Sequence, residues 1–200
     1  MIYVLISIFS YLLGSINPAY IFGRIKGFDI RERGSKNAGA SNAKLCLGWK
    51  YFIICVIFDI SKAIISILII RYILLGNKLM EIVGGCFTII GHCFPFYLNF
   101  KGGKGFASYI GLSLTINYKI FVIIMIIALI LAIISNYIVT ATMILSFSVP
   151  IVAYILKMSV NCIICLILMT TLIVFQHRSN FIKFIHNQEI GINGKTIGLK

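Results

Sequence analysis

The sequence predicts an all-α integral membrane protein with about seven transmembrane helices, some of them short, in a single polytopic domain over residues 1–200. Of the 200 residues, 60% are hydrophobic and only 12% are charged. The mean hydropathy of +1.03 is far above that of an average soluble domain. The charged residues lie mostly in short segments between long apolar stretches, which leaves little chain for a separate soluble domain.

Seven apolar segments account for the helices in chain order. They are residues 2–22, 51–75, 80–98, 106–117, 120–135, 138–156 and 160–176. No Lys or Arg precedes the first segment and no small-residue cleavage site follows it, so we expect a retained first span. The fourth and fifth segments are short for a crossing, which needs about 20 residues, and they either cross tilted or form one re-entrant pair. Pro18, Pro95 and Pro150 are tolerated, because neighbouring helices can satisfy the carbonyls that a kink frees.

The Lys and Arg residues between the segments predict the orientation. If all seven segments cross, thirteen of these residues fall on one side of the membrane, namely Arg24, Lys26, Arg31, Arg33, Lys36, Lys44, Lys50, Lys101, Lys104, Arg178, Lys183, Lys195 and Lys200. The other side receives only three, namely Lys78, Lys119 and Lys157. The positive-inside rule makes the first side cytoplasmic, with the N-terminus outside and the C-terminus in the cytoplasm.

The charge balance narrows the class of partner. The formal net charge is +13, with 18 Lys and Arg against 5 Asp and Glu. Apolar runs of this length exclude a disordered tail and a soluble nucleic-acid binder, so the basic excess indicates phosphate or lipid. The six Cys lie mostly inside apolar stretches, where a thiol packs as a small hydrophobe. No group of His, Cys and carboxylates has the spacing of a metal site.

The first of three polar segments at the cytoplasmic side is residues 31–44. Small residues such as Gly39 let the backbone approach a ligand, and Ser35, Asn37 and Asn42 supply hydrogen-bonding groups near the bilayer surface. A flexible basic loop that touches anionic headgroups is the alternative interpretation.

The second polar segment is residues 99–105, directly before a predicted helix. Its glycines can turn backbone N–H groups toward an anion, the helix N-terminus adds a positive dipole, and Lys101 and Lys104 add full charges. It is not a nucleotide P-loop, because Leu98 and Gly105 stand where that motif needs Gly and Ser or Thr. A tight basic turn between spans is the alternative.

The third polar segment is residues 177–189, at the end of the last apolar segment. The imidazole of His177, the guanidinium of Arg178 and the amide of Asn180 emerge together, and they can accept a proton, bind a phosphate and orient a hydroxyl. Alternatively, His177 and Arg178 only provide positive charge that interacts favourably with the dipole at the helix C-terminus.

Asp59, Lys62 and His92 are ionisable residues inside the apolar segments. Asp59 and Lys62 are three residues apart on one helix face, so we expect them to pair, in structural support rather than in lining a polar pocket. His92 is more typical of a packed, hydrogen-bonded core histidine than of a ligand.

The polar segments together resemble the bacterial acyl-phosphate:glycerol-3-phosphate acyltransferase family. The resemblance runs from about residue 12 to residue 189 and rests on the order and spacing of its motifs. These are Gly14–Tyr20, Asp29–Arg31, Gly34–Asn42, Gly91–Pro95, Phe100–Gly105, His177–Asn180 and Glu189.

The resemblance implies a bacterial inner-membrane enzyme with a cytoplasmic active site and no metal or other cofactor. It would transfer an acyl group from acyl phosphate to the 1-hydroxyl of glycerol 3-phosphate, giving lysophosphatidic acid and phosphate. Besides membrane lipid and its two substrates, it would meet transiently the soluble phosphate acyltransferase that makes acyl phosphate; no nucleic acid is implied. The implied catalytic residues are Ser35, Lys104 and His177. The implied substrate-binding residues are Asn37, Gly39, Asn42, Lys101, Gly102, Gly103, Gly105, Thr142, Arg178 and Asn180.

The sequence departs from the family pattern at several positions, and two of them bear on the implied site. Leu45 stands where the family usually carries Arg, with Lys44 beside it, and a lysine cannot form the bidentate fork of an arginine. Val139 replaces a residue that usually carries a hydroxyl, whereas Thr142 keeps one.

Three questions stay open from the sequence. The proton of the glycerol hydroxyl goes either to His177 or to an oxygen of the acyl phosphate. A membrane carrier for a phosphorylated solute would also use basic loops and an intramembrane ion pair, although it would scatter polar residues to both faces. A degenerate scaffold that binds lipid without chemistry is the third possibility.

Overall fold

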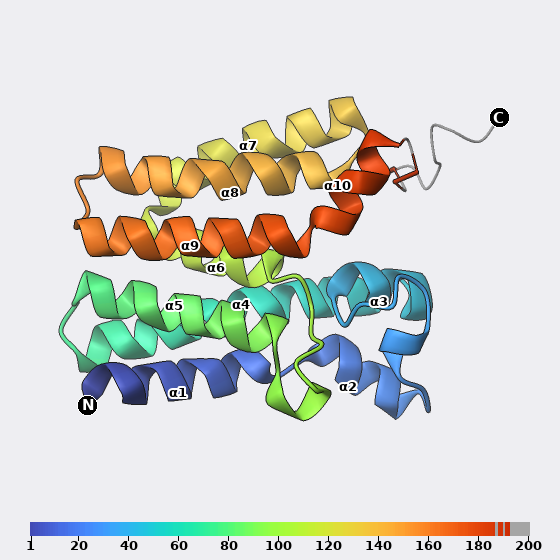
Figure 1. The fold of residues 1–200 in the computed structure, drawn as a ribbon, viewed down its shortest axis with the longest axis horizontal. Helices are drawn as coiled ribbons and strands as arrows, with labels where there is room; N and C mark the ends of the chain where they lie inside the picture. Colours follow the sequence, from blue (N-terminus) through green and yellow to red (C-terminus); the bar gives the residue numbers. More distant parts are fainter. Residues whose placement is uncertain (187, 190, 193–200) are drawn as a thin grey trace. The chain divides into compact units, whose positions relative to one another are not determined.

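Every regular element in the described part of the chain is helical (Figure 1). The computed structural model describes residues 1–186, 188, 189, 191 and 192. The chain divides into two compact units, Met1–Thr115 and Ile116–Lys200, which are described separately below.

The first unit is built around three long helices that run side by side. Its elements are α1 (Ile2–Ser15), α2 (Pro18–Ile25), η1 (Ile30–Glu32), α3 (Ala40–Leu47), α4 (Trp49–Ile73), α5 (Lys78–Cys93), η2 (Phe96–Leu98) and α6 (Phe106–Ile116). In Figure 1, α1 lies beside α5, and α4 lies behind them. The short elements α2, η1 and α3 gather at one end of this unit, next to the loop between α5 and α6.

The first apolar segment forms two helices instead of one, because local chemistry breaks it after Ile16. Asn17 caps α2 by accepting a hydrogen bond from Tyr20 N at 2.9 Å, and Pro18 occupies the first turn, where its missing N–H costs nothing. Ile16 itself is extended. The break therefore leaves carbonyl groups at the end of α1 that other parts of the unit must satisfy.

Helices α1 and α5 approach so closely that only glycine fits at two positions. A Cβ on Gly14 would lie 2.1 Å from the carbonyl oxygen of Thr88, and a Cβ on Gly91 would lie 2.2 Å from that of Tyr11. Small residues allow this backbone contact between helices in a membrane. The contact fixes how the end of α5, and thus the loop after it, lies against α1.

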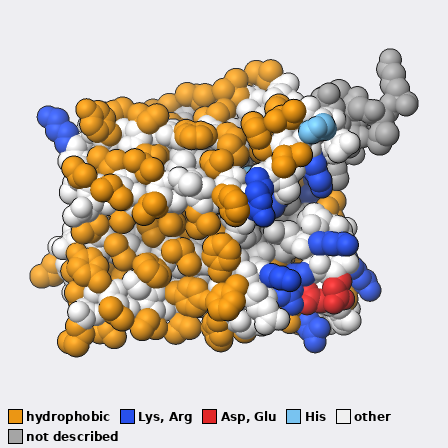
Figure 2. Space-filling view, in the orientation of Figure 1, with side chains coloured by type: hydrophobic (Ala, Val, Ile, Leu, Met, Phe, Trp, Pro, Cys, Tyr) orange, Lys and Arg blue, Asp and Glu red, His pale blue; other side chains and the backbone are white. Residues whose placement is uncertain are grey.

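The polar end of the first unit has its own small core. Ala19, Ile30, Ala38, Ala43 and Cys55 are buried in one cluster, which joins α2, η1, the following loop, α3 and α4. This packing holds the segment 31–44 in place. Figure 2 shows Lys, Arg and acidic side chains gathered where this end of the unit is drawn, while hydrophobic side chains cover the flanks of the helices.

The second unit contains α7 (Tyr118–Ser135), α8 (Ile138–Ile155), α9 (Val160–Gln176) and α10 (Arg178–Ile185). Ala128, Ala132 and Ala141 pack α7 against α8. The hydroxyl of Thr170 in α9 donates to Ser146 O in α8 at 2.8 Å. Helix α10 bends away from α9 by 54°.

Five stretches of the described residues are long and apolar enough to cross a membrane. They are Ile2–Ile25, Trp49–Ile73, Lys78–Leu98, Tyr118–Ser135 and Ile138–Ile155, and the bent pair of α9 and α10 makes a sixth if it counts as one span. The predicted all-α membrane fold is confirmed. The number of about seven crossings and the orientation of the termini stay predictions.

The fourth and fifth apolar segments, both expected to be short, form helices of different length. Helix α6 has 11 residues, as its short apolar segment predicts. Helix α7 has 18 residues, because Asn117 caps it and it begins at Tyr118, two positions before the expected start, so it is long enough for a crossing of its own. Pro150 lies inside α8 without ending it.

Replacing Gly91 by Ala tests the close approach of α1 and α5. The added methyl group collides with backbone, so we expect the free energy of unfolding to fall by about 1–3 kcal/mol. Thermal unfolding in detergent, followed by circular dichroism, measures the change. Gly23→Ala is the comparison variant, because its Cβ would meet its nearest neighbours at 3.2 Å, a tight contact that needs a much smaller shift, so we expect a smaller loss. Equal melting temperatures for the two variants would contradict the packing described here.

Candidate active site

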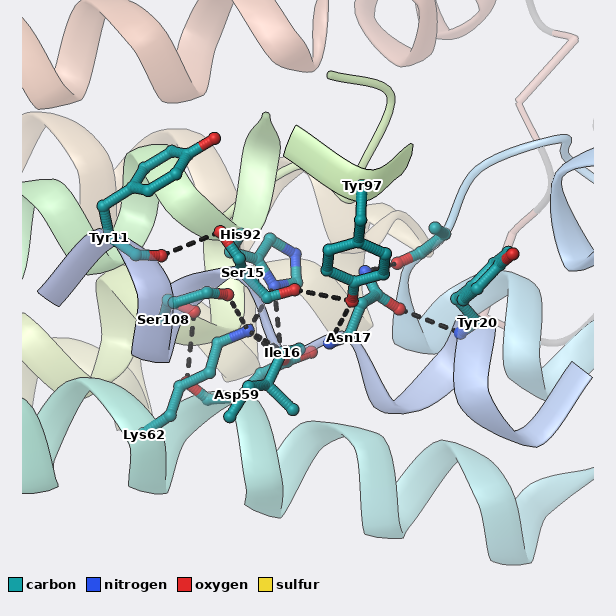
Figure 3. Close-up of polar contacts among 12 residues, drawn as sticks. Tyr11, Ser15, Ile16, Asn17, Tyr20, Asp59, Lys62, His92, Tyr97 and Ser108 are labelled. Atoms are coloured by element: carbon teal, nitrogen blue, oxygen red, sulfur yellow. Dashed lines mark hydrogen bonds and ion pairs between the residues drawn. The ribbon is translucent and has the colours of Figure 1, made fainter. Parts of the chain in front are cut away.

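The break between α1 and α2 is hydrogen-bonded to the first polar segment and to η2, which directly precedes the second (Figure 3). The Asn17 side chain donates to Ala38 O at 2.8 Å, which anchors the loop before α3. The Tyr97 hydroxyl donates to Ser15 O at 2.8 Å and accepts from Asn17 N at 3.2 Å. Sequence reasoning gave Asn17 and Tyr97 no site role, although Asn17 belongs to the Gly14–Tyr20 motif.

Arg31, held in a salt bridge with Asp29, connects the start of the first polar segment to the end of η2, directly before the second polar segment. Arg31 Nη2 lies 2.6 Å from Asp29 Oδ2, Arg31 Nε lies 3.0 Å from Asp29 Oδ1, and Arg31 Nη1 donates to Leu98 O at 2.7 Å. The Arg31 guanidinium holds the pKa of the Asp29 carboxyl below its ordinary value, because it hydrogen-bonds the charged form. The clamp thus joins η1 to the end of η2.

Asn42 braces the first polar segment from within. Its Oδ1 accepts from Ser35 N at 2.7 Å, and its Nδ2 donates to Ile30 O at 2.8 Å and Arg33 O at 3.0 Å. The side chain is 1% exposed. Asn42 therefore shapes the loop around the exposed Ser35, in place of the open hydrogen-bonding group that the sequence analysis expected.

Gly102 and Gly103 of the second polar segment allow this loop to pack closely against the end of α5. Gly102 N donates to Cys93 O at 3.0 Å and Gly103 N donates to His92 O at 3.1 Å, so these two amides point at the end of α5. This corrects the expectation that they face an anion. A Cβ on Gly103 would lie 2.1 Å from His92 Nε2, and one on Gly102 would lie 2.1 Å from His92 O.

The two polar segments meet at their glycines. A Cβ built on Gly39 would lie 3.9 Å from Gly103 Cα. Lys101 is exposed beside this contact and Lys104 is half-buried. Gly105 has a φ of +83°, which favours glycine, and its carbonyl accepts from Tyr109 N in the first turn of α6. The first unit thus brings Ser35, Asn37, Gly39, Asn42, Lys101, Gly102, Gly103, Lys104 and Gly105 to one end.

A buried ionic cluster lies behind these loops. Lys62 Nζ lies 2.8 Å from Asp59 Oδ1, which confirms the expected pair, and 2.9 Å from His92 Nδ1. Lys62 also donates to Gly14 O at 2.8 Å and to Ile16 O at 2.9 Å, at the end of α1. Figure 3 shows these groups converging from α1, α4 and α5. The i,i+3 spacing signalled the pair, but nothing local signalled that His92 would join it.

No basic side chain stands at position 45, where the resemblance implies an arginine. Leu45 is 54% exposed. Lys44 does not take the position of the missing arginine, since its Nζ lies 4.0 Å from the centre of the Trp49 ring in a cation–π contact.

The remaining predicted site residues lie in the second unit, three of them where α9 gives way to α10. His177 is 8% exposed and its Nδ1 lies 2.8 Å from Ile173 O. Arg178 is exposed and donates to Phe175 O at 2.9 Å, and Asn180 donates to the carboxylate of Glu189. Thr142 is buried in α8, with its hydroxyl 3.3 Å from Ile138 O. Val139 is buried in the same helix.

Comparison with known proteins gives one consistent result. Residues 4–187 match the family described as Glycerol-3-phosphate acyltransferase. Glycerol-3-phosphate acyltransferase 1 of Oceanobacillus iheyensis is 31% identical over 196 residues, covering 94% of this chain and 94% of its own. Glycerol-3-phosphate acyltransferase of a Thermoanaerobacter species is 33% identical over 194 residues, covering 96% and 97%.

Two crystal structures of PlsY (YgiH), an integral membrane glycerol 3-phosphate acyltransferase, have the same fold. The glycerol 3-phosphate form matches with a TM-score of 0.88 at 27% identity, over 96% of each chain. The lysophosphatidic acid form matches with a TM-score of 0.85 at 27% identity, over 96% of this chain and 95% of that one.

Replacing Asp29 by Asn tests the clamp with Arg31. Because the folded-state pKa of Asp29 is lowered, its contribution to stability is complete above the ordinary value of about 3.9 and is lost as the pH falls through the lowered pKa. We expect the variant to unfold more easily than the native protein by about 1 kcal/mol near pH 7. The difference should shrink below about pH 4.

Thermal unfolding in detergent across this pH range provides the measurement. Glu32→Gln is the control, because Glu32 is an exposed carboxylate in the same short helix. A difference for Asp29→Asn that stays constant down to about pH 3 would contradict the assigned role of its charge.

Proposed function

The chain belongs to the glycerol-3-phosphate acyltransferase family, and we propose that acyl phosphate is the acyl donor. The 1-hydroxyl oxygen of glycerol 3-phosphate attacks the acyl carbonyl carbon, and an ester bond forms. The bond between that carbon and the phosphate oxygen breaks. The products are lysophosphatidic acid and inorganic phosphate, with the hydroxyl proton passing to His177 or to a phosphate oxygen.

The meeting of the two polar segments carries this proposal. Gly39 lies against Gly103 within a basic end of the first unit, with Lys101 exposed and Lys104 beside it. A dianionic phosphate fits such a place, since two positive charges lie next to backbone without bulky side chains. The helix N-terminus of α6 adds a favourable dipole.

Within this arrangement the first unit holds the acyl phosphate. The exposed Ser35 and the half-buried Asn37 offer hydrogen bonds to the phosphate or to the acyl carbonyl, and Lys104 stabilises the negative charge that develops as the bond breaks. Asn42, Gly102 and Gly103 contribute by shaping the loops. The acyl chain lies among apolar helix surfaces, where each buried CH₂ contributes about 0.8 kcal/mol.

The second unit supplies the groups for glycerol 3-phosphate. Arg178 is suited to the phosphate because its fork matches two phosphate oxygens, and Asn180 and Thr142 can orient the glycerol. His177 is the candidate base, since its Nδ1 donates to Ile173 O and a neutral imidazole then carries its basic lone pair on Nε2. Because the donor is an activated anhydride, alignment and one proton transfer suffice, and no covalent nucleophile is needed.

We place the whole chain, as one domain, in the inner membrane of a bacterium with this site facing the cytoplasm. The uneven distribution of Lys and Arg supports that orientation. Acyl phosphate hydrolyses readily in water, so a transient contact with the soluble phosphate acyltransferase that makes it is expected.

An assay of the purified, detergent-solubilised protein with two donors tests the proposed reaction. With glycerol 3-phosphate and acyl phosphate, we expect equal amounts of lysophosphatidic acid and inorganic phosphate; with acyl-CoA we expect no product. Product from acyl-CoA alone would overturn the proposed donor. A folded protein that uses neither donor would instead favour the carrier or the degenerate scaffold.

Replacing His177 by Ala tests the candidate base and the second unit. Loss of a general base or its equivalent contact lowers kcat by about 100-fold or more. His186→Ala is a matched control, because the exposed His186 makes the same contact with the carbonyl four residues earlier, at 2.8 Å, and has no assigned role. We expect His186→Ala to keep nearly full activity in the same phosphate-release assay. Equal activity of both variants would remove His177 from the mechanism.

A further inference from the structure

The buried cluster of Asp59, Lys62 and His92 lies outside the groups assigned to substrates. Each of the three residues is 2–3% exposed. Burying an ion pair costs several kcal/mol per ion unless its geometry and hydrogen bonds compensate, and packed hydrophobic residues often serve stability equally well. Ionisable residues inside membrane spans therefore indicate a function beyond stability.

Lys62 connects the cluster to the first polar segment through hydrogen bonds. Lys62 donates to Gly14 O and Ile16 O, and so holds the backbone where α1 ends. The next residue, Asn17, donates to Ala38 O, and Ala38 directly precedes Gly39. Two hydrogen-bonded steps thus connect the buried ammonium group to the loop proposed to contact the acyl phosphate.

His92 connects the cluster to the second polar segment. Its Nδ1 lies 3.1 Å from Asp59 Oδ1 and 2.9 Å from Lys62 Nζ, which fixes the plane of the ring. The opposite ring nitrogen, Nε2, faces Gly103 so closely that a Cβ there would lie 2.1 Å away. The His92 ring packs against the Gly102–Gly103 turn, and Gly103 lies next to Gly39.

We propose that His92, held by Asp59 and Lys62, is a positioning residue that sets the place of the Gly102–Gly103 turn for the acyl donor. This inference rests on the proposed function of the two loops. It assigns no contact between His92 and substrate. The cluster thereby supports both loops that bind the acyl donor: Lys62 holds the loop before α3 through Asn17, and His92 holds the Gly102–Gly103 turn.

A double-mutant cycle between His92 and Gly103 tests the proposal. His92→Asn keeps a polar group near the Nδ1 position, so Asp59 and Lys62 retain a partner, but it removes the part of the ring that faces Gly103. We expect it to lower kcat/KM for acyl phosphate by about 100-fold, the scale of a misplacement of about 1 Å. The KM for glycerol 3-phosphate should change less than twofold.

Gly103→Ala should cost a similar factor in the native background but less than threefold in the His92→Asn background, because the colliding ring atoms are gone. Gly102→Ala is the matched control. Its Cβ would meet the backbone oxygen of His92, which no substitution at position 92 removes, so its cost should be the same in both backgrounds. Equal penalties for Gly103→Ala in both backgrounds, or a native kcat/KM for acyl phosphate in His92→Asn, would overturn the proposal.

Hydrogen exchange followed by mass spectrometry keeps the test independent of turnover. His92→Asn should speed exchange of peptides covering residues 99–105 at least tenfold, and Lys62→Met replaces it if it does not fold. Lys50→Met is the control and should leave this exchange unchanged, because Lys50 is an exposed lysine on the same helix α4. Unchanged exchange would contradict positioning. If the native protein turns over neither donor, the proposed function fails, and the exchange result still decides the positioning role.

Discussion

A single buried ammonium group, that of Lys62, carries the connection between the membrane helices and the polar loops. In a bilayer every backbone carbonyl must find a donor, and the break after α1 frees the carbonyls of Gly14 and Ile16. Lys62 satisfies both, and Asp59 and His92 surround its charge. The break exists because Asn17 and Pro18 start a new helix. Without the buried cation, this end of the first unit would hold unsatisfied backbone groups.

The glycine-rich motifs of this family have two different physical causes here. Gly14 and Gly91 lie where backbones of α1 and α5 touch, and Gly102 and Gly103 lie where a loop touches His92. In each case a side chain would collide with fixed atoms. The amides of Gly102 and Gly103 donate to the end of α5, so the positive character of this loop comes from Lys101, Lys104 and the start of α6. Space and charge at the site are thus provided by different residues.

This separation suits the acyl phosphate donor that we propose. Acyl transfer from an anhydride needs alignment and electrostatic stabilisation more than a reactive nucleophile, so rigid loops matter as much as reactive groups. Asn42 holds the loop around Ser35, and the clamp of Asp29 with Arg31 holds it to Leu98. The polar end is therefore ordered by side chains that do not themselves need to meet substrate.

The sequence by itself determined the membrane class, the helical segments and the pairing of Asp59 with Lys62, because hydropathy and i,i+3 spacing are local properties of the chain. It also identified the family through the order of its motifs. Only the tertiary structure decided that Gly102 and Gly103 face His92 and that Asn42 braces its own loop. Those outcomes depend on which carbonyls and rings the folded loops bring against a residue, and these contacts, 7 to 12 residues apart in the chain, follow no helical periodicity that could signal them.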